Sequence, residues 1–190
     1  MQSMNHIVLV SGLPRSGTSL MMQMLHAGGM PVLTDERRPP DLANPRGYFE
    51  FEAVKHTRQN AAWIQQAAGK AVKVIYRLLY DLPEDQPLRV IFMRRNLSQV
   101  VASQQAMLGR PPGSVAENHR LITIFQRELA QLDGWLTTRP QISVLNVAHE
   151  RLMAHPEVVV KEIGTFLTQS LDLTAMQKAI QPALYRQRHI

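Results

Sequence analysis

The feature that most constrains the fold is a strand, a tight turn and a helix that follow one another directly near the start of the chain. Residues 6–11 form a short apolar run bounded by turn signals, which is the pattern of a strand buried on both faces of a sheet. Residues 18–27 carry apolar side chains at helical spacing, and Gly28-Gly29 ends that pattern. We therefore expect a buried first strand, central in its sheet, that leads through a turn into a helix.

The turn between them, residues 12–19, is a candidate anion-binding site. Such a turn aims backbone N–H groups and the positive end of the helix dipole at one point beyond the carboxyl edge of the sheet. Its glycine spacing matches the nucleotide-binding P-loop, but Thr18 stands where that motif requires Lys. The nearest cation is Arg15, whose forked donors can hold a phosphoryl or sulfonyl group, and the alternative is a turn whose glycines serve geometry alone.

Strands and helices alternate along the rest of the chain. The patterns predict strands over 71–76, 88–93 and 141–147, helices over 52–68, 96–108, 115–136, 156–167 and 173–180, and an irregular segment over 34–48. This alternation predicts an α/β, P-loop NTPase-like three-layer fold, with a central, mostly parallel sheet flanked by helices. No repeat or low-complexity tract interrupts it, so we expect a single domain over residues 1–190.

Composition narrows the chemistry. Without cysteine, the chain has no disulfide, no thiolate metal site and no cysteine nucleophile. The formal net charge of +6 indicates an anionic partner, and the scatter of the basic residues favours a small polyphosphorylated ligand over nucleic acid. The histidines lack ligand spacing with carboxylates, so we expect no metal site. We also expect no membrane span and no signal peptide, and hence a cytoplasmic protein.

Two motifs resemble one known family. The segment Leu13-Pro-Arg-Ser-Gly-Thr-Ser19 resembles the 5′-phosphosulfate-binding loop of the sulfotransferase superfamily, whose donor is 3′-phosphoadenosine 5′-phosphosulfate (PAPS). The segment 90–103 resembles the signature that binds the 3′-phosphate of PAPS, with Arg95 and Ser103 eight positions apart. Segments 44–50 and 184–186 extend the likeness to a bacterial-type branch over nearly the whole chain.

The resemblance implies a PAPS-dependent sulfotransferase that moves a sulfuryl group to a hydroxyl or amine by in-line displacement. Arg94 is the rival of Arg95, but its register with Ser103 is wrong by one residue. Asn96 and Leu97 depart from the Asp and Pro common in relatives, and neither change removes a phosphate ligand. The implied PAPS-binding residues are Pro14, Arg15, Ser16, Gly17, Thr18, Ser19, Arg95, Ser103 and Arg186, with Arg188 as the alternative to Arg186.

The resemblance also suggests catalytic residues. Arg15 is the first candidate for stabilising charge on the bridging oxygen, and Lys73 is the second, because many relatives carry a Lys at the end of the equivalent strand. The His that many relatives use as a base, two positions further on, is Ile75 here. Glu50 is therefore the first candidate for the base, since other branches use a Glu. The alternatives are Glu52 and His56.

Two other functions stay open from the residues alone. A P-loop kinase or nucleotide hydrolase is disfavoured by Thr18 and by Arg94-Arg95, which stand where a Mg²⁺-binding Asp is expected. The second is a nucleotide-binding module without catalysis. The acceptor, a small molecule or a glycan, leaves no readable motif. We expect segments 34–48 and 107–114 to build its pocket, and a homo-oligomer is compatible with this reading.

Overall fold

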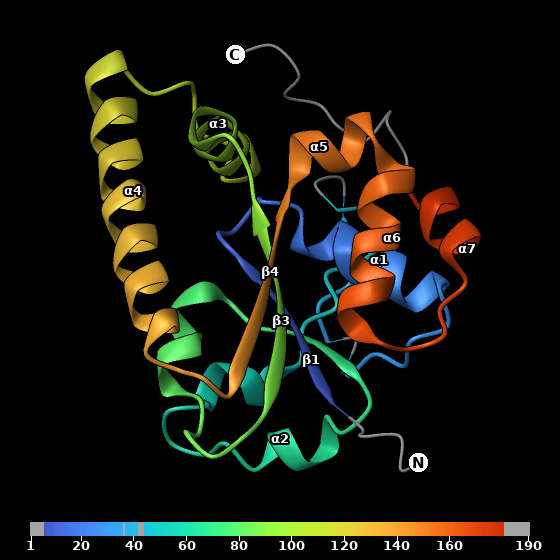
Figure 1. The fold of residues 1–190 in the computed structure, drawn as a ribbon. Helices are drawn as coiled ribbons and strands as arrows, with labels where there is room; N and C mark the ends of the chain where they lie inside the picture. The colour runs from blue at the N-terminus through green and yellow to red at the C-terminus, as the bar shows by residue number, and fades with distance from the viewer. Residues whose placement is uncertain (1–5, 36, 42–43, 181–190) are drawn as a thin grey trace.

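The computed structural model describes residues 6–35, 37–41 and 44–180 (Figure 1). Within that part of the chain, one parallel sheet has the strand order β2-β1-β3-β4. The predicted α/β fold with a central parallel sheet flanked by helices is confirmed. The strands are β1 (Ile7–Gly12), β2 (Ala71–Lys73), β3 (Leu88–Arg94) and β4 (Ile142–Ala148).

Alternate residues of the buried strands point into two hydrophobic clusters, one on each face of the sheet. Val8 and Val10 of β1 belong to one cluster, and Ile7 and Leu9 belong to the other. Figure 1 shows the resulting layers, with α3 and α4 on one side of the sheet and α1, α6 and α7 on the other. These helices span Thr18–Ala27 (α1), Leu97–Met107 (α3), Val115–Thr137 (α4), Pro156–Leu167 (α6) and Leu173–Lys178 (α7).

β1 is an interior strand, as its uninterrupted apolar pattern predicts. It pairs in parallel with β2 on one side and with β3 on the other, and all of its residues are buried. Its carboxyl end therefore leads into the middle of the sheet's carboxyl edge, the usual place for a ligand in an open parallel sheet.

Most predicted boundaries agree with the structure within one or two residues, and the predicted helices over 18–27 and 156–167 coincide with α1 and α6. Side-chain caps mark the starts of two other helices. Asn96 accepts hydrogen bonds from the backbone N–H groups of Ser98 and Gln99 at the start of α3. Ser114 and Glu117 form a capping box at the start of α4.

The helix predicted over 52–68 is wrong. The segment instead forms a short 3₁₀ helix, η1 (Glu52–His56), and a four-residue helix, α2 (Trp63–Gln66). Polar side chains interrupt it, because Thr57 Oγ1 donates to the Val54 carbonyl and accepts from Trp63 Nε1. Asn60 Oδ1 also accepts from the Ala62 N–H. These local bonds satisfy the backbone in place of a continuous helix.

Two further elements differ from the predictions. β2 ends at Lys73 instead of residue 76, and a 3₁₀ helix, η2 (Tyr76–Asp81), begins soon after it. A short helix that the sequence pattern did not indicate, α5 (His149–Ala154), follows β4 directly. α5 places His149 at the carboxyl edge of the sheet, directly after β4. Among the described residues, no helix has both the length and the apolar character needed to cross a bilayer.

Candidate active site

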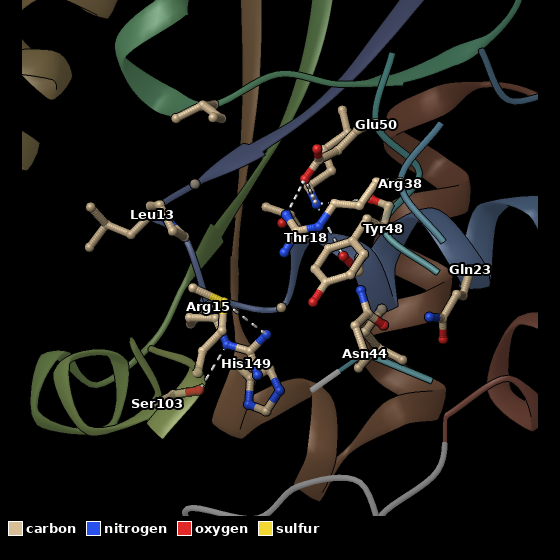
Figure 2. A pocket seen from close by; sticks show the side chains of 18 of the residues that line it. Leu13, Arg15, Thr18, Gln23, Arg38, Asn44, Tyr48, Glu50, Ser103 and His149 are labelled. Atoms are coloured by element: carbon tan, nitrogen blue, oxygen red, sulfur yellow. Dashed lines mark hydrogen bonds and ion pairs between the residues drawn. The ribbon is translucent and has the colours of Figure 1, made fainter. Parts of the chain in front are cut away.

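A cavity of about 740 Å³ opens at the carboxyl edge of the sheet (Figure 2). Its lining comes from segments far apart in the sequence: the loop after β1, the start of α1, the segment 38–50, the end of β2, and α3 and α5. Figure 2 shows Arg15, Ser103 and His149 toward one end of the cavity and Arg38, Tyr48 and Glu50 toward the other. The cavity thus joins the two motifs recognised in the sequence to the irregular segment between them.

The backbone of the loop after β1 is tightly turned. The Ser16 N–H donates to the Leu13 carbonyl at 3.0 Å, and Arg15 adopts a left-handed conformation with φ 73°. Gly17 has φ 106°, and a Cβ there would lie 2.7 Å from His149 Cδ2. Gly17 is therefore required both by its backbone conformation and by the packing of His149 against it.

The start of α1 has the features of an anion site. Its N-cap is Gly17, no side chain caps it, and its first turn contains no acidic residue, so its N–H groups face the loop without a carboxylate. Ser16 Oγ is buried and makes no hydrogen bond within the part of the chain that the structure describes. A buried hydroxyl of this kind costs about 1–3 kcal/mol unless a ligand supplies its partner.

Three hydrogen bonds tie the loop to the second motif. Arg15 Nε donates to Ser103 Oγ at 3.0 Å, and Arg95 donates through one terminal nitrogen to the Arg15 carbonyl at 3.0 Å. Gln104 Nε2 donates to the Pro14 carbonyl at 3.1 Å. The two motifs, about 80 positions apart, therefore form one structural unit.

The structure separates Arg95 from its rival. Arg94 Nε donates to Asn146 Oδ1 at 2.8 Å, and the same guanidinium pairs with Asp133 of α4, so it points away from the loop. Arg95 contacts the loop and Gln99 Oε1, but it is not among the described residues that line the cavity, whereas Ser103 is. The spacing argument that favours Arg95 over Arg94 agrees with this placement.

Lys73 lies at the end of β2, where it reaches two parts of the site. Its Nζ donates to Ser19 Oγ at 3.1 Å and to the Tyr48 carbonyl at 2.9 Å, and it lies 3.9 Å from Glu50 Oε1. Burial lowers the pKa of Lys73 to about 8, while the charge of Glu50 raises it and the charges of Arg38 and Arg15 lower it. Lys73 is therefore a partly buried cation whose pKa lies closer to neutrality than that of an exposed lysine.

The three carboxylate and imidazole candidates for the base differ in position. Glu50 lines the cavity, and its Oε1 accepts from an Arg38 terminal nitrogen at 3.0 Å. Glu52 instead pairs with Lys55 at 2.8 Å and lies 3.9 Å from His56 Nε2, and neither Glu52 nor His56 lines the cavity. Of the three, only Glu50 could receive a proton from a molecule bound there.

Sequence reasoning missed two residues of the site. His149 is 5% exposed, lines the cavity and packs against Gly17. Burial, with a smaller contribution from the charge of Arg95, lowers the pKa of His149 to about 4, although Glu150 raises it. Its place directly after β4 was a usable signal, because the carboxyl ends of parallel strands share one edge. Arg38, the other missed residue, had no motif to mark it.

The remaining expectations concern the chain end and metals. Arg186 and Arg188 lie outside the described residues. Within residues 6–35, 37–41 and 44–180, no group of three or more His, Asp or Glu side chains could hold a metal ion.

The sequence and the structure were compared with known protein families, solved structures and curated proteins. A family model described as "Sulfotransferase domain" matches residues 5–187. Among solved structures, the chain is similar to an unliganded sugar kinase from Janibacter sp. HTCC2649, with 12% sequence identity and a TM-score of 0.41. That alignment covers 90% of this chain and 98% of the kinase chain. No curated protein matches the sequence.

Proposed function

The chain belongs to the sulfotransferase domain family, and on that premise we propose that it transfers a sulfuryl group from PAPS to a hydroxyl or amine acceptor by in-line displacement. The observation that carries the proposal is the convergence of three groups on one cavity: the loop at the start of α1, the cation Lys73 and the carboxylate of Glu50. In-line transfer from an oxygen of the donor to an oxygen or nitrogen of the acceptor needs an anion-binding loop, a cation and a base, placed together.

The residues present fit PAPS as donor. The loop and the uncapped start of α1 would hold the 5′-phosphosulfate. The buried Ser16 hydroxyl belongs to the same loop, although Ser16 is not among the described residues that line the cavity. Arg95 and Ser103, both bonded to Arg15 or its carbonyl, would hold the 3′-phosphate. The cavity volume lies in the range usual for cofactor and small-molecule sites. When bound, PAPS supplies the sulfuryl group and a bisphosphate leaving group.

Three residues of the chain have separate roles in the proposed transfer. Glu50 receives the acceptor's proton at Oε2, because its Oε1 is already bonded to Arg38. The proton leaves the acceptor oxygen or nitrogen as that atom forms its new bond to sulfur. Lys73, held at Ser19 Oγ beside the loop, neutralises the negative charge that develops on the oxygen from which the sulfuryl group departs. Arg15 contributes a second positive charge at the loop.

The donor assignment is tested by isothermal titration calorimetry with adenosine 3′,5′-bisphosphate, AMP and ADP. We expect the 3′,5′-bisphosphate to bind at least about tenfold more tightly than the other two, because only it carries a 3′-phosphate. Arg95→Ala should remove most of that preference. Arg94→Ala is the matched control, since Arg94 points to Asn146, and it should keep the preference. Equal affinities for the three nucleotides would reject PAPS as donor.

The transfer itself is tested with ³⁵S-labelled PAPS and a panel of sugars, phenols and amines. Transfer of label to any of them establishes a sulfotransferase. Tight bisphosphate binding without transfer would instead indicate a nucleotide-binding module, and Mg²⁺-dependent turnover of ATP would indicate a kinase or nucleotide hydrolase.

A further inference from the structure

The carboxylate of Glu50 has three cations around it. An Arg38 terminal nitrogen lies 3.0 Å from Oε1, Lys73 Nζ lies 3.9 Å from Oε1, and Lys55 Nζ lies 4.0 Å from Oε2. Arg38 is thus the one of the three within hydrogen-bond distance. Lys73 stays beyond it, even though a buried ammonium and a carboxylate of opposite charge attract each other strongly.

Arg38 is held in place from its other side. Its guanidinium carbon lies 3.3 Å from the centroid of the Tyr48 ring, and Figure 2 shows the two side chains together beside Glu50. Tyr48 is 4% exposed, and its hydroxyl is within hydrogen-bond distance of both carboxylate oxygens of Asp41, at 2.9 and 2.8 Å. A guanidinium stacked on a fixed ring and bonded to a carboxylate has a defined position.

The backbone that presents Glu50 is strained. Phe49 has φ 53°, a left-handed conformation that is costly for a bulky residue. Lys73 holds the carbonyl before it, that of Tyr48, and the Thr34 hydroxyl donates to the carbonyl after it, that of Glu50, at 2.9 Å. The chain therefore expends free energy to direct the Glu50 side chain into the cavity, which is typical of a functional segment.

We propose that Arg38 is a positioning residue: it binds Glu50 Oε1 and thereby keeps the carboxylate apart from Lys73, so that Glu50 and Lys73 remain separate groups in the cavity. The proposal rests on the proposed function, because the two roles that it keeps separate are those of base and cation. Without Arg38, Lys73 is the nearest remaining partner of Oε1. A direct contact there would draw Nζ away from Ser19 Oγ and would occupy the carboxylate.

The charges that face Lys73 determine the direction in which its pKa should change when Arg38 is removed. Glu50 faces it from the segment 38–50, Arg38 from the same segment and Arg15 from the loop after β1, and its two hydrogen-bond partners, Ser19 and Tyr48, are neutral. Removing Arg38 takes away a positive charge and lets Glu50 approach. Both changes favour the protonated ammonium, so the pKa of Lys73 should rise above its wild-type value of about 8.

The first experiment follows the ¹³Cε resonance of Lys73 by NMR as a function of pH in the 190-residue chain without ligand. The resonance is assigned by its loss in Lys73→Arg, against Lys55, Lys70, Lys161 and Lys178. Arg38→Gln should raise the titration midpoint by roughly half a pH unit or more. The matched control is Arg37→Gln, because Arg37 is the adjacent arginine, is largely exposed and pairs with Asp35. The midpoint of Lys73 in this variant should equal that of the wild type.

The second experiment measures sulfate transfer from labelled PAPS. Arg38→Gln should lower kcat by about tenfold or more while the affinity for adenosine 3′,5′-bisphosphate stays within about twofold, and Arg38→Lys should restore part of kcat because it keeps the positive charge. Arg37→Gln should behave like the wild type. If Arg38→Gln does not fold, Arg38→Met takes its place, and the same rise of the Lys73 midpoint is expected because this variant also removes the positive charge.

The two experiments separate the two proposals. A wild-type protein that transfers no sulfate overturns the proposed function, and the NMR titration then still decides whether Arg38 separates Glu50 from Lys73. An unchanged Lys73 midpoint in Arg38→Gln overturns the role of Arg38, whether or not sulfate is transferred.

Discussion

Arg15 Nε lies 3.0 Å from Ser103 Oγ and donates a hydrogen bond to it, although 88 positions separate the two residues in the sequence. Ser103 is 2% exposed, and Arg15 adopts a left-handed backbone conformation at the tip of its loop. The pair connects the turn after β1 to helix α3 at the cavity. One hydroxyl thus links the two motifs that the sequence presents separately.

Ser103→Ala should weaken binding of adenosine 3′,5′-bisphosphate by roughly tenfold, because it removes both the acceptor for Arg15 and a proposed ligand of the 3′-phosphate. Isothermal titration calorimetry measures the effect. Ser98→Ala is the matched control, a serine of the same helix away from the loop, and it should bind like the wild type. Equal binding by both variants would contradict a role for Ser103 in the donor site.

Gly17→Ala should destabilise the protein by about 1–3 kcal/mol, because an alanine is strained at φ 106° and its Cβ would lie 2.7 Å from His149 Cδ2. Urea unfolding gives the free energy, and calorimetry should show weaker bisphosphate binding as well. Gly134→Ala is the control, since Gly134 lies in α4 with open space where the Cβ would be. It should be neutral or stabilising by up to about 1 kcal/mol. A Gly17→Ala variant with the free energy of unfolding of the wild type would contradict the requirement for glycine at this position.

Glu50→Gln should reduce kcat for sulfate transfer by about 100-fold or more, because an amide cannot accept the acceptor's proton. Binding of adenosine 3′,5′-bisphosphate, measured by calorimetry, should change little. Glu52→Gln provides the comparison: this carboxylate pairs with Lys55 outside the cavity, and its loss should leave kcat within about threefold. The assignment of Glu50 as base fails if the two variants are equally active.

His149 makes the stability of the protein depend on pH. Its pKa is lowered to about 4 in the folded state, against about 6.5 in the unfolded chain, so between these values the unfolded chain binds more protons. The free energy of unfolding should therefore fall as the pH drops from about 6.5 to 4, by roughly 2–3 kcal/mol from this residue. In His149→Gln that part of the dependence should vanish.

Urea unfolding at a series of pH values measures this effect. His119→Gln is the control, because His119 is exposed on α4, and it should keep the wild-type dependence. The same slope in His149→Gln as in the wild type would show that His149 does not remain neutral on folding.

Local patterns were sufficient for much of the fold. The apolar run of β1 and the apolar spacing of α1 depend on neighbouring residues only, and both elements are confirmed. The starts of α3 and α4 are local as well, because side-chain caps at Asn96 and Ser114 hold them. The helix predicted over 52–68 is wrong because side-chain hydrogen bonds there compete with the helical backbone. Its side chains Thr57, Asn60 and Trp63 form hydrogen bonds with each other and with the backbone, and helical spacing does not register such competition.

The sequence by itself determined the family, through the loop 13–19 and the Arg95 and Ser103 spacing, because both motifs are short and depend on covalent order. Only the tertiary structure decided which side chains share the cavity at the end of β1. It brought Glu50 within 3.9 Å of Lys73 and within 3.0 Å of Arg38, and it placed His149 beside Gly17. These groups lie on separate loops and strands, and no local pattern records a distance that depends on how the strands of a sheet are ordered.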